Sequence, residues 1–179
     1  MVKHQGGIVS AAQVVTTTAV STDSLDIGIK DASGNVTVGR DLGQGGDIVA
    51  NFVPLTSVTA AGAATVTFEI ITADDAALTS NVTVLASSRP YAKEELAVVT
   101  TVGNSSTLPI TVTIPANLSA RPAAGPVSGA GANQYKPRMR RYLGVRYTIA
   151  TGPLNTGSFN AWFGPNHVGD ANKWYPAGW

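Results

Sequence analysis

The chain has 179 residues, contains no cysteine, and carries charge at only 13% of its positions, with a net charge of +1. This length fits one domain with a sizeable core, and the lack of cysteine excludes a disulfide framework, a thiolate metal site and a cysteine nucleophile. No apolar run approaches the roughly 20 residues that a membrane-spanning helix needs, and the N-terminus lacks the apolar core of a secretory signal. We therefore expect a soluble, unprocessed protein that does not contact a membrane.

The near-neutral total hides an acidic first part and a basic second part. Residues 1–103 hold ten acidic and five basic side chains, whereas no acidic residue occurs between Glu95 and Asp170. Opposite patches on neighbouring copies attract, so this division is compatible with head-to-tail or shell-like association. A chance distribution over solvated loops explains it equally well.

Apolar and polar side chains alternate with period 2 along much of the chain, which predicts half-buried β-strands. The clearest runs are residues 25–29, 65–70, 110–114 and 142–149, and further candidates are residues 13–20, 35–39, 47–53, 81–86, 95–101 and 157–163. Pro54, Pro109 and Pro115 are expected at the edges of such runs, where a missing N–H does little harm. About eight to ten short strands predict an all-β fold, an antiparallel β-sandwich of the jelly-roll type.

One segment has the pattern of a short helix instead. Residues 72–79 begin with a threonine that can cap a helix, continue with Asp74 and Asp75, and then contain alanines. Acids in a first turn stabilise the helix dipole, so one or two helical turns are predicted here.

Two segments do not look like ordinary strands. Residues 116–137 are rich in alanine, glycine, serine and proline, and predict a long loop inserted at about 102–137. Residues 164–179 have no periodic pattern, yet they hold two of the three tryptophans, whereas a solvated tail is normally poor in aromatics. We therefore expect a sandwich domain at 1–163 and an extended C-terminal arm at 164–179, which docks on a neighbour or folds back over its own sandwich.

A search for chemistry finds no catalytic, cofactor-binding or metal-binding residues. His4 and His167 are the only histidines, and neither has metal-ligand or triad spacing. Residues 43–46 are rich in glycine but lack the lysine of a phosphate-binding loop. Asp74 and Asp75 lack the spacing of a calcium loop. These observations predict that the protein is not an enzyme and needs no cofactor.

The candidate contact residues lie in a basic cluster and in the aromatic arm. They are Lys136, Arg138, Arg140 and Arg141 in the cluster, and Trp174, Tyr175 and Trp179 in the arm. The cluster has three explanations, namely an acidic protein partner, nucleic acid, or protection of a strand edge against aggregation. Because the chain has no nucleic-acid recognition motif, the prediction is a protein partner without direct contact to nucleic acid. The arm aromatics have the character of anchors that fill a groove.

Several segments in order resemble a known family. They are residues 24–28, 59–67, 72–80 and 141–153, the last reading Arg-Tyr-Leu-Gly-Val-Arg-Tyr-Thr-Ile-Ala-Thr-Gly-Pro. This succession resembles the small jelly-roll cement (decoration) proteins of tailed bacteriophages, particularly those on the heads of short-tailed phages. The resemblance spans roughly residues 10–163, and the inserted loop and the aromatic arm depart from it.

The resemblance implies a structural virion protein, made in the host cytoplasm and carried on the outer capsid surface. Such a protein bridges adjacent major capsid protein subunits, associates with copies of itself as a dimer or trimer, and resists the internal pressure of packaged DNA. The alternative is a carbohydrate- or receptor-binding β-sandwich module of a virion, since surface tryptophans and tyrosines also stack on sugars.

Overall fold

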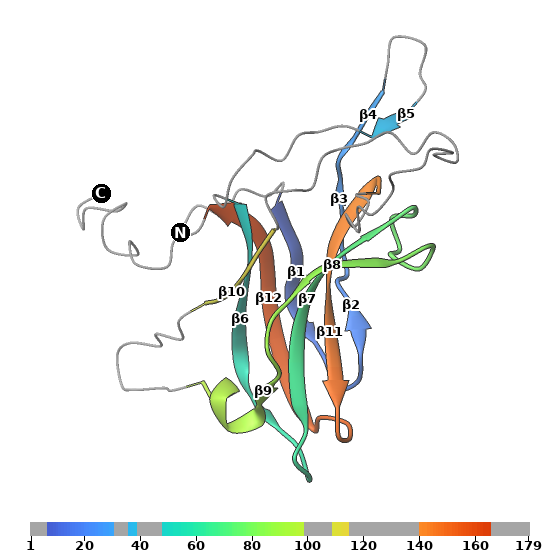
Figure 1. The fold of residues 1–179 in the computed structure, drawn as a ribbon. Helices are drawn as coiled ribbons and strands as arrows, with labels where there is room; N and C mark the ends of the chain where they lie inside the picture. Colours follow the sequence, from blue (N-terminus) through green and yellow to red (C-terminus); the bar gives the residue numbers. More distant parts are fainter. Residues whose placement is uncertain (1–6, 31–35, 39–47, 99–108, 115–139, 166–179) are drawn as a thin grey trace, which may run out of the picture.

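The computed structural model describes residues 7–30, 36–38, 48–98, 109–114 and 140–165, which form a sandwich of two antiparallel sheets (Figure 1). The first sheet has the order β1 (Ile8–Val14), β12 (Thr156–Pro165), β6 (Ile48–Thr59), β10 (Ile110–Thr113). The second has the order β2 (Ala19–Val20), β11 (Tyr142–Ala150), β7 (Thr65–Ala73), β8 (Thr83–Ser87), with β3 (Leu25–Asp26) beside β11 and β9 (Tyr91–Ala92) beside β7. The short strands β4 (Gly28–Lys30) and β5 (Val36–Val38) form a separate hairpin.

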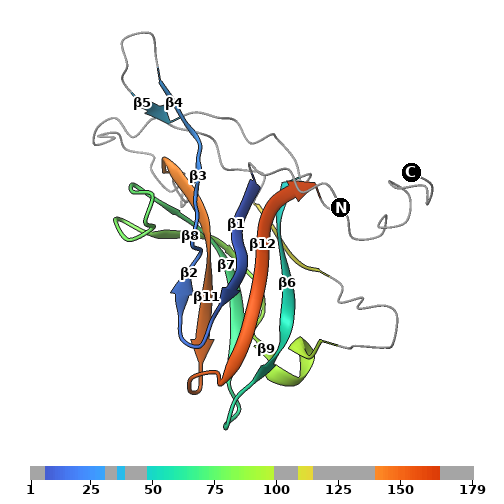
Figure 2. The same ribbon diagram turned by 180° about the vertical axis from the view of Figure 1, so that it is seen from behind.

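The chain passes repeatedly from one sheet to the other. Strand β1 lies in the first sheet and β2 in the second, β6 in the first and β7 and β8 in the second, and β10, β11 and β12 alternate again. Each sheet therefore pairs strands that are far apart in sequence, and the views from both sides show β1, β12 and β6 next to one another (Figure 2). This order is that of a jelly roll, which confirms the predicted fold class.

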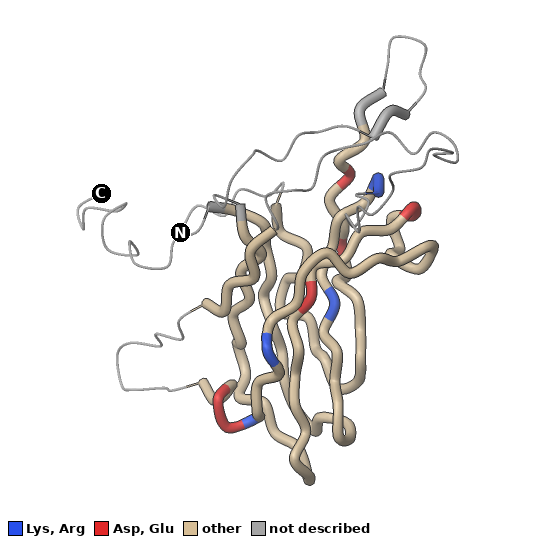
Figure 3. The backbone as a smooth tube through the Cα atoms, viewed as in Figure 1, with Lys and Arg blue, Asp and Glu red and all other residues tan. Residues whose placement is uncertain are grey.

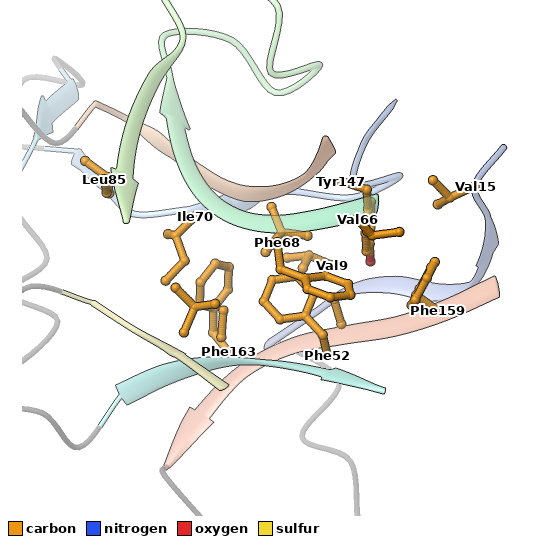
Figure 4. Close-up of a cluster of buried hydrophobic side chains, with 14 of the residues drawn as sticks. Val9, Val15, Phe52, Val66, Phe68, Ile70, Leu85, Tyr147, Phe159 and Phe163 are labelled. Carbon is orange, nitrogen blue, oxygen red and sulfur yellow. The ribbon is translucent and has the colours of Figure 1, made fainter. Parts of the chain in front are cut away.

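The core between the sheets is built around four aromatic rings. Phe52 from the first sheet meets Phe68 from the second with ring centroids 4.8 Å apart, and Tyr147 stacks on Phe159 at 5.2 Å (Figure 4). All four side chains have 0% exposure. The period-2 alternation explains this arrangement, since every second residue of β7 and β11 points inward.

Most of the predicted strands are present, with different limits. The strand predicted at residues 47–53 is longer in the structure, because β6 continues to Thr59. It includes Pro54, which lies opposite Phe159 of β12. The pairing of β6 with β10 ends before this proline, at Phe52. The single strand expected at 13–20 is two separate strands, β1 and β2, in different sheets. The strand expected at 95–101 is wrong in its described part, where Lys93–Leu96 form a 3-10 helix, η2, and residues 97–98 have no regular structure.

The helix predicted at 72–79 is also wrong. Thr72 and Ala73 continue β7 and pair with β11, and residues 74–80 form a turn. The Asp75 carboxylate organises that turn, since it accepts hydrogen bonds from the backbone N–H groups of Thr79 (3.0 Å) and Ser80 (2.6 Å). Aspartate competes with helices in this way by bonding to nearby backbone groups, and pairing with β11 adds a non-local gain.

The loop and the arm lie largely outside the described residues. Within the range 102–137, Ile110–Thr113 pair with β6 and so belong to the sandwich. Of the arm, Gly164 and Pro165 continue β12, opposite Val49 and Ile48.

Candidate interaction surface

Two of the predicted contact residues lie in the described structure, Arg140 and Arg141, directly before β11. The other five, Lys136, Arg138, Trp174, Tyr175 and Trp179, lie outside the described residues. β11 has β7 on one side and the strands β2 and β3 on the other, and the two arginines reach carboxylates on opposite sides of it.

Arg140 contacts the carboxylate that follows β7. Its Nη1 lies 2.7 Å from both Oδ1 and Oδ2 of Asp74, and its backbone N–H donates to Thr72 Oγ1 at 2.7 Å. The Arg140 guanidinium holds the pKa of Asp74 below its usual range, and the Asn81 amide adds to this by donating at 2.7 Å. Arg140 therefore connects the end of β7 to the start of β11.

Arg141 contacts the carboxylate of Asp26 on β3. The contact is bidentate, with Nη2 donating to Oδ2 at 2.8 Å and Nε to Oδ1 at 3.1 Å, and this hydrogen bonding raises the pKa of Arg141. Its guanidinium also lies 4.9 Å from the centre of the Tyr142 ring, a cation–π distance. Planar two-point contacts of this kind hold an arginine in one orientation.

A third pair lies further along the same strand. Arg146 on β11 is directly opposite Glu69 on β7, and its Nε donates to Glu69 Oε2 at 2.5 Å. Thr148 adds a hydroxyl donor to the same oxygen at 2.8 Å. The Glu69 side chain is only 13% exposed, so this pair is the most enclosed of the three.

These contacts change the interpretation of the charge division. Each of the three arginines comes from the basic second part of the chain, and each acid comes from the acidic first part. Three such pairs therefore form within one folded chain, and the charges of the described residues gather on the second sheet and the loops (Figure 3). The sequence does not identify these acids as partners of the arginines. Its one signal is the outward position of Glu69 and Arg146 in their alternating strands, and this predicts a contact only once β7 and β11 are known to pair.

The turn after β7 folds over the outer face of the second sheet. Leu78, at a φ of 57°, is 1% exposed and forms a small apolar cluster with Ile71 and Ala73. Gly144 on β11 leaves room for it, since an added Cβ at Gly144 would lie 3.2 Å from Leu78 Cδ2 and closer still to Cδ1. The hydrogen bonds from the Ser80 backbone and the Thr79 side chain lower the pKa of Asp75 and hold the turn in place.

The opposite end of the second sheet has its own charged group. Arg89 donates to both oxygens of Glu95, at 2.5 and 3.0 Å, and lies 4.0 Å from the centre of the Tyr91 ring. Arg89 and the backbone N–H of Ala92 lower the pKa of Glu95 to about 2. Lys93 Nζ donates to the carbonyls of Ala60 and Gly62 and so ties η2 to the β6–β7 turn.

Within the described ranges, no group of three or more histidine and acidic side chains is placed to hold a metal ion. Nor does any helix in this part of the chain have the length and hydrophobicity that crossing a bilayer takes.

The sequence model of the Bbp16 family matches residues 9–114, which is more than half of the chain. The chain belongs to the Bbp16 family. The matched region runs from β1 to the residue after β10 and ends before β11 and β12. No curated protein matches the chain.

Proposed function

We propose that this protein is a capsid cement protein, which binds the outer surface of an icosahedral phage shell and holds neighbouring major capsid protein subunits together. The observation that carries the proposal is the strand order, because a jelly roll is the fold that the resemblance to phage cement proteins implies. A fold alone does not specify a function, so the residues that would make the contacts must also be considered.

The described body has the properties of a stiff spacer. Its aromatic core has no exposure, and its charged side chains are tied to one another across β3, β7 and β11. A stiff body transmits force between the subunits it connects, and many copies on one shell multiply individually modest contacts.

The arm aromatics are the principal anchors in this proposal. Arg140 and Arg141 already have carboxylate partners in their own chain. An acidic capsid surface would have to break these ion pairs in order to bind the two arginines, so the net gain in binding free energy would be small. Trp174, Tyr175 and Trp179 instead follow the last strand, and large aromatics dominate the energetics of many interfaces. Lys136 and Arg138 add a basic contribution from the segment before β11.

The test is co-sedimentation with expanded shells of the phage. The truncation is placed after Pro165, because this leaves β12 whole. A cut further upstream, for example after Asn160, would remove β12 residues that pair with β6. We expect the truncated protein to keep its thermal unfolding temperature and to bind shells at least about tenfold more weakly, the effect of losing one aromatic hot spot. A full-length variant with alanine at 174, 175 and 179 should behave in the same way.

Arg140→Gln serves as the matched control, with an expected change in shell affinity of less than about threefold. Truncated protein that decorates shells with undiminished affinity would show that the arm is not an anchor.

The alternative, a sugar-binding module, needs aromatic rings side by side on rigid strands. Tyr91 pairs with Val66 and Tyr142 with Ala73, at opposite ends of β7, so roughly 23 Å separates them. Each ring also has an arginine of its own chain against it. These features favour the cement protein over the sugar-binding module.

A further inference from the structure

We draw no further inference here: the strongest candidate, the hairpin of β4 and β5 that forms a sheet of its own apart from the two sheets of the sandwich, carries none, because nothing in the part of the chain that the structure describes shows what covers it.

Discussion

The contact between Gly144 and Leu78 allows a sharp test of how the turn after β7 is held. An added Cβ at Gly144 would lie 2.9 Å from Ser21 Oγ and 3.2 Å from Leu78 Cδ2, with Leu78 Cδ1 closer still. Real Cβ atoms do not approach other atoms that closely, so Gly144→Ala must displace Leu78, which is 1% exposed. Overpacking of this kind destabilises by about 1–3 kcal/mol.

A second effect acts in the opposite direction. Gly144 does not have a positive φ, so alanine there also reduces the entropy of the unfolded chain, a gain of about 0.4–1 kcal/mol. We therefore expect a net loss of about 1–2 kcal/mol in the free energy of unfolding, measured by urea titration with far-ultraviolet circular dichroism. Gly62→Ala is the control, since its added Cβ would meet only Thr151 O at 3.8 Å, and it should be neutral or slightly stabilising.

The double variant tests the assigned cause. Leu78→Ala alone removes a buried leucine and should cost about 2–5 kcal/mol. In that background the contacts with Leu78 are gone and only the close approach to Ser21 Oγ remains of the three. Gly144→Ala should therefore cost at least about 0.5 kcal/mol less than it does in the wild-type background, and this difference is the coupling energy. Strict additivity, or a stabilising effect of Gly144→Ala alone, would show that Leu78 does not pack on this glycine.

Three further variants test buried and charged groups. Tyr147→Phe should leave the free energy of unfolding unchanged or raise it by up to about 1 kcal/mol, because the buried Tyr147 hydroxyl has the Ser10 side chain beside it but makes no hydrogen bond of ordinary geometry; a loss above about 1 kcal/mol in urea would contradict this. Arg146→Met should destabilise by about 1–3 kcal/mol in the same assay, since it leaves the carboxylate of Glu69 largely enclosed, and an unchanged urea midpoint would show that the pair contributes nothing. Glu95 has a folded-state pKa of about 2, below its unfolded value, so its contribution is present above pH ~4.5 and is lost as the pH falls towards 2. The difference in urea midpoint between wild type and Glu95→Gln should therefore be largest near neutral pH and vanish near pH 2, whereas a constant difference would point to a cause other than the pairing with Arg89.

Local patterns were sufficient for strands such as β7 and β11 and insufficient for the turn after β7. The alternation in residues 65–70 and 142–149 depends only on neighbouring residues, and β7 and β11 lie where it predicts them. Residues 72–79 have helix-forming composition, but the pairing of Thr72 and Ala73 with β11, about seventy residues away in sequence, outweighs that preference. The sequence of a short segment does not show how much stability the segment gains by pairing with a distant strand.

Only part of the candidate contact surface could be predicted from the sequence. Arg140 and Arg141 stand out in sequence as basic residues, yet their partners Asp74 and Asp26 are 66 and 115 residues away. No spacing rule connects such residues, because their proximity results from the order of strands in the sheet. The prediction that Trp174, Tyr175 and Trp179 contact a partner rests on sequence, and the shell-binding experiment is its test.

Composition and period-2 alternation by themselves determined that this chain forms mostly strands and, in β7 and β11, which side chains face inward, because both properties depend on neighbouring residues. The tertiary structure decided which strands pair, and so brought the acidic and basic parts of the chain into contact on one sheet. It also collected four strands without a single charge, separated by long stretches of sequence, into the other sheet. The physical reason is that strand pairing is non-local, and only packing of the whole core selects one order among the many that the same strands allow.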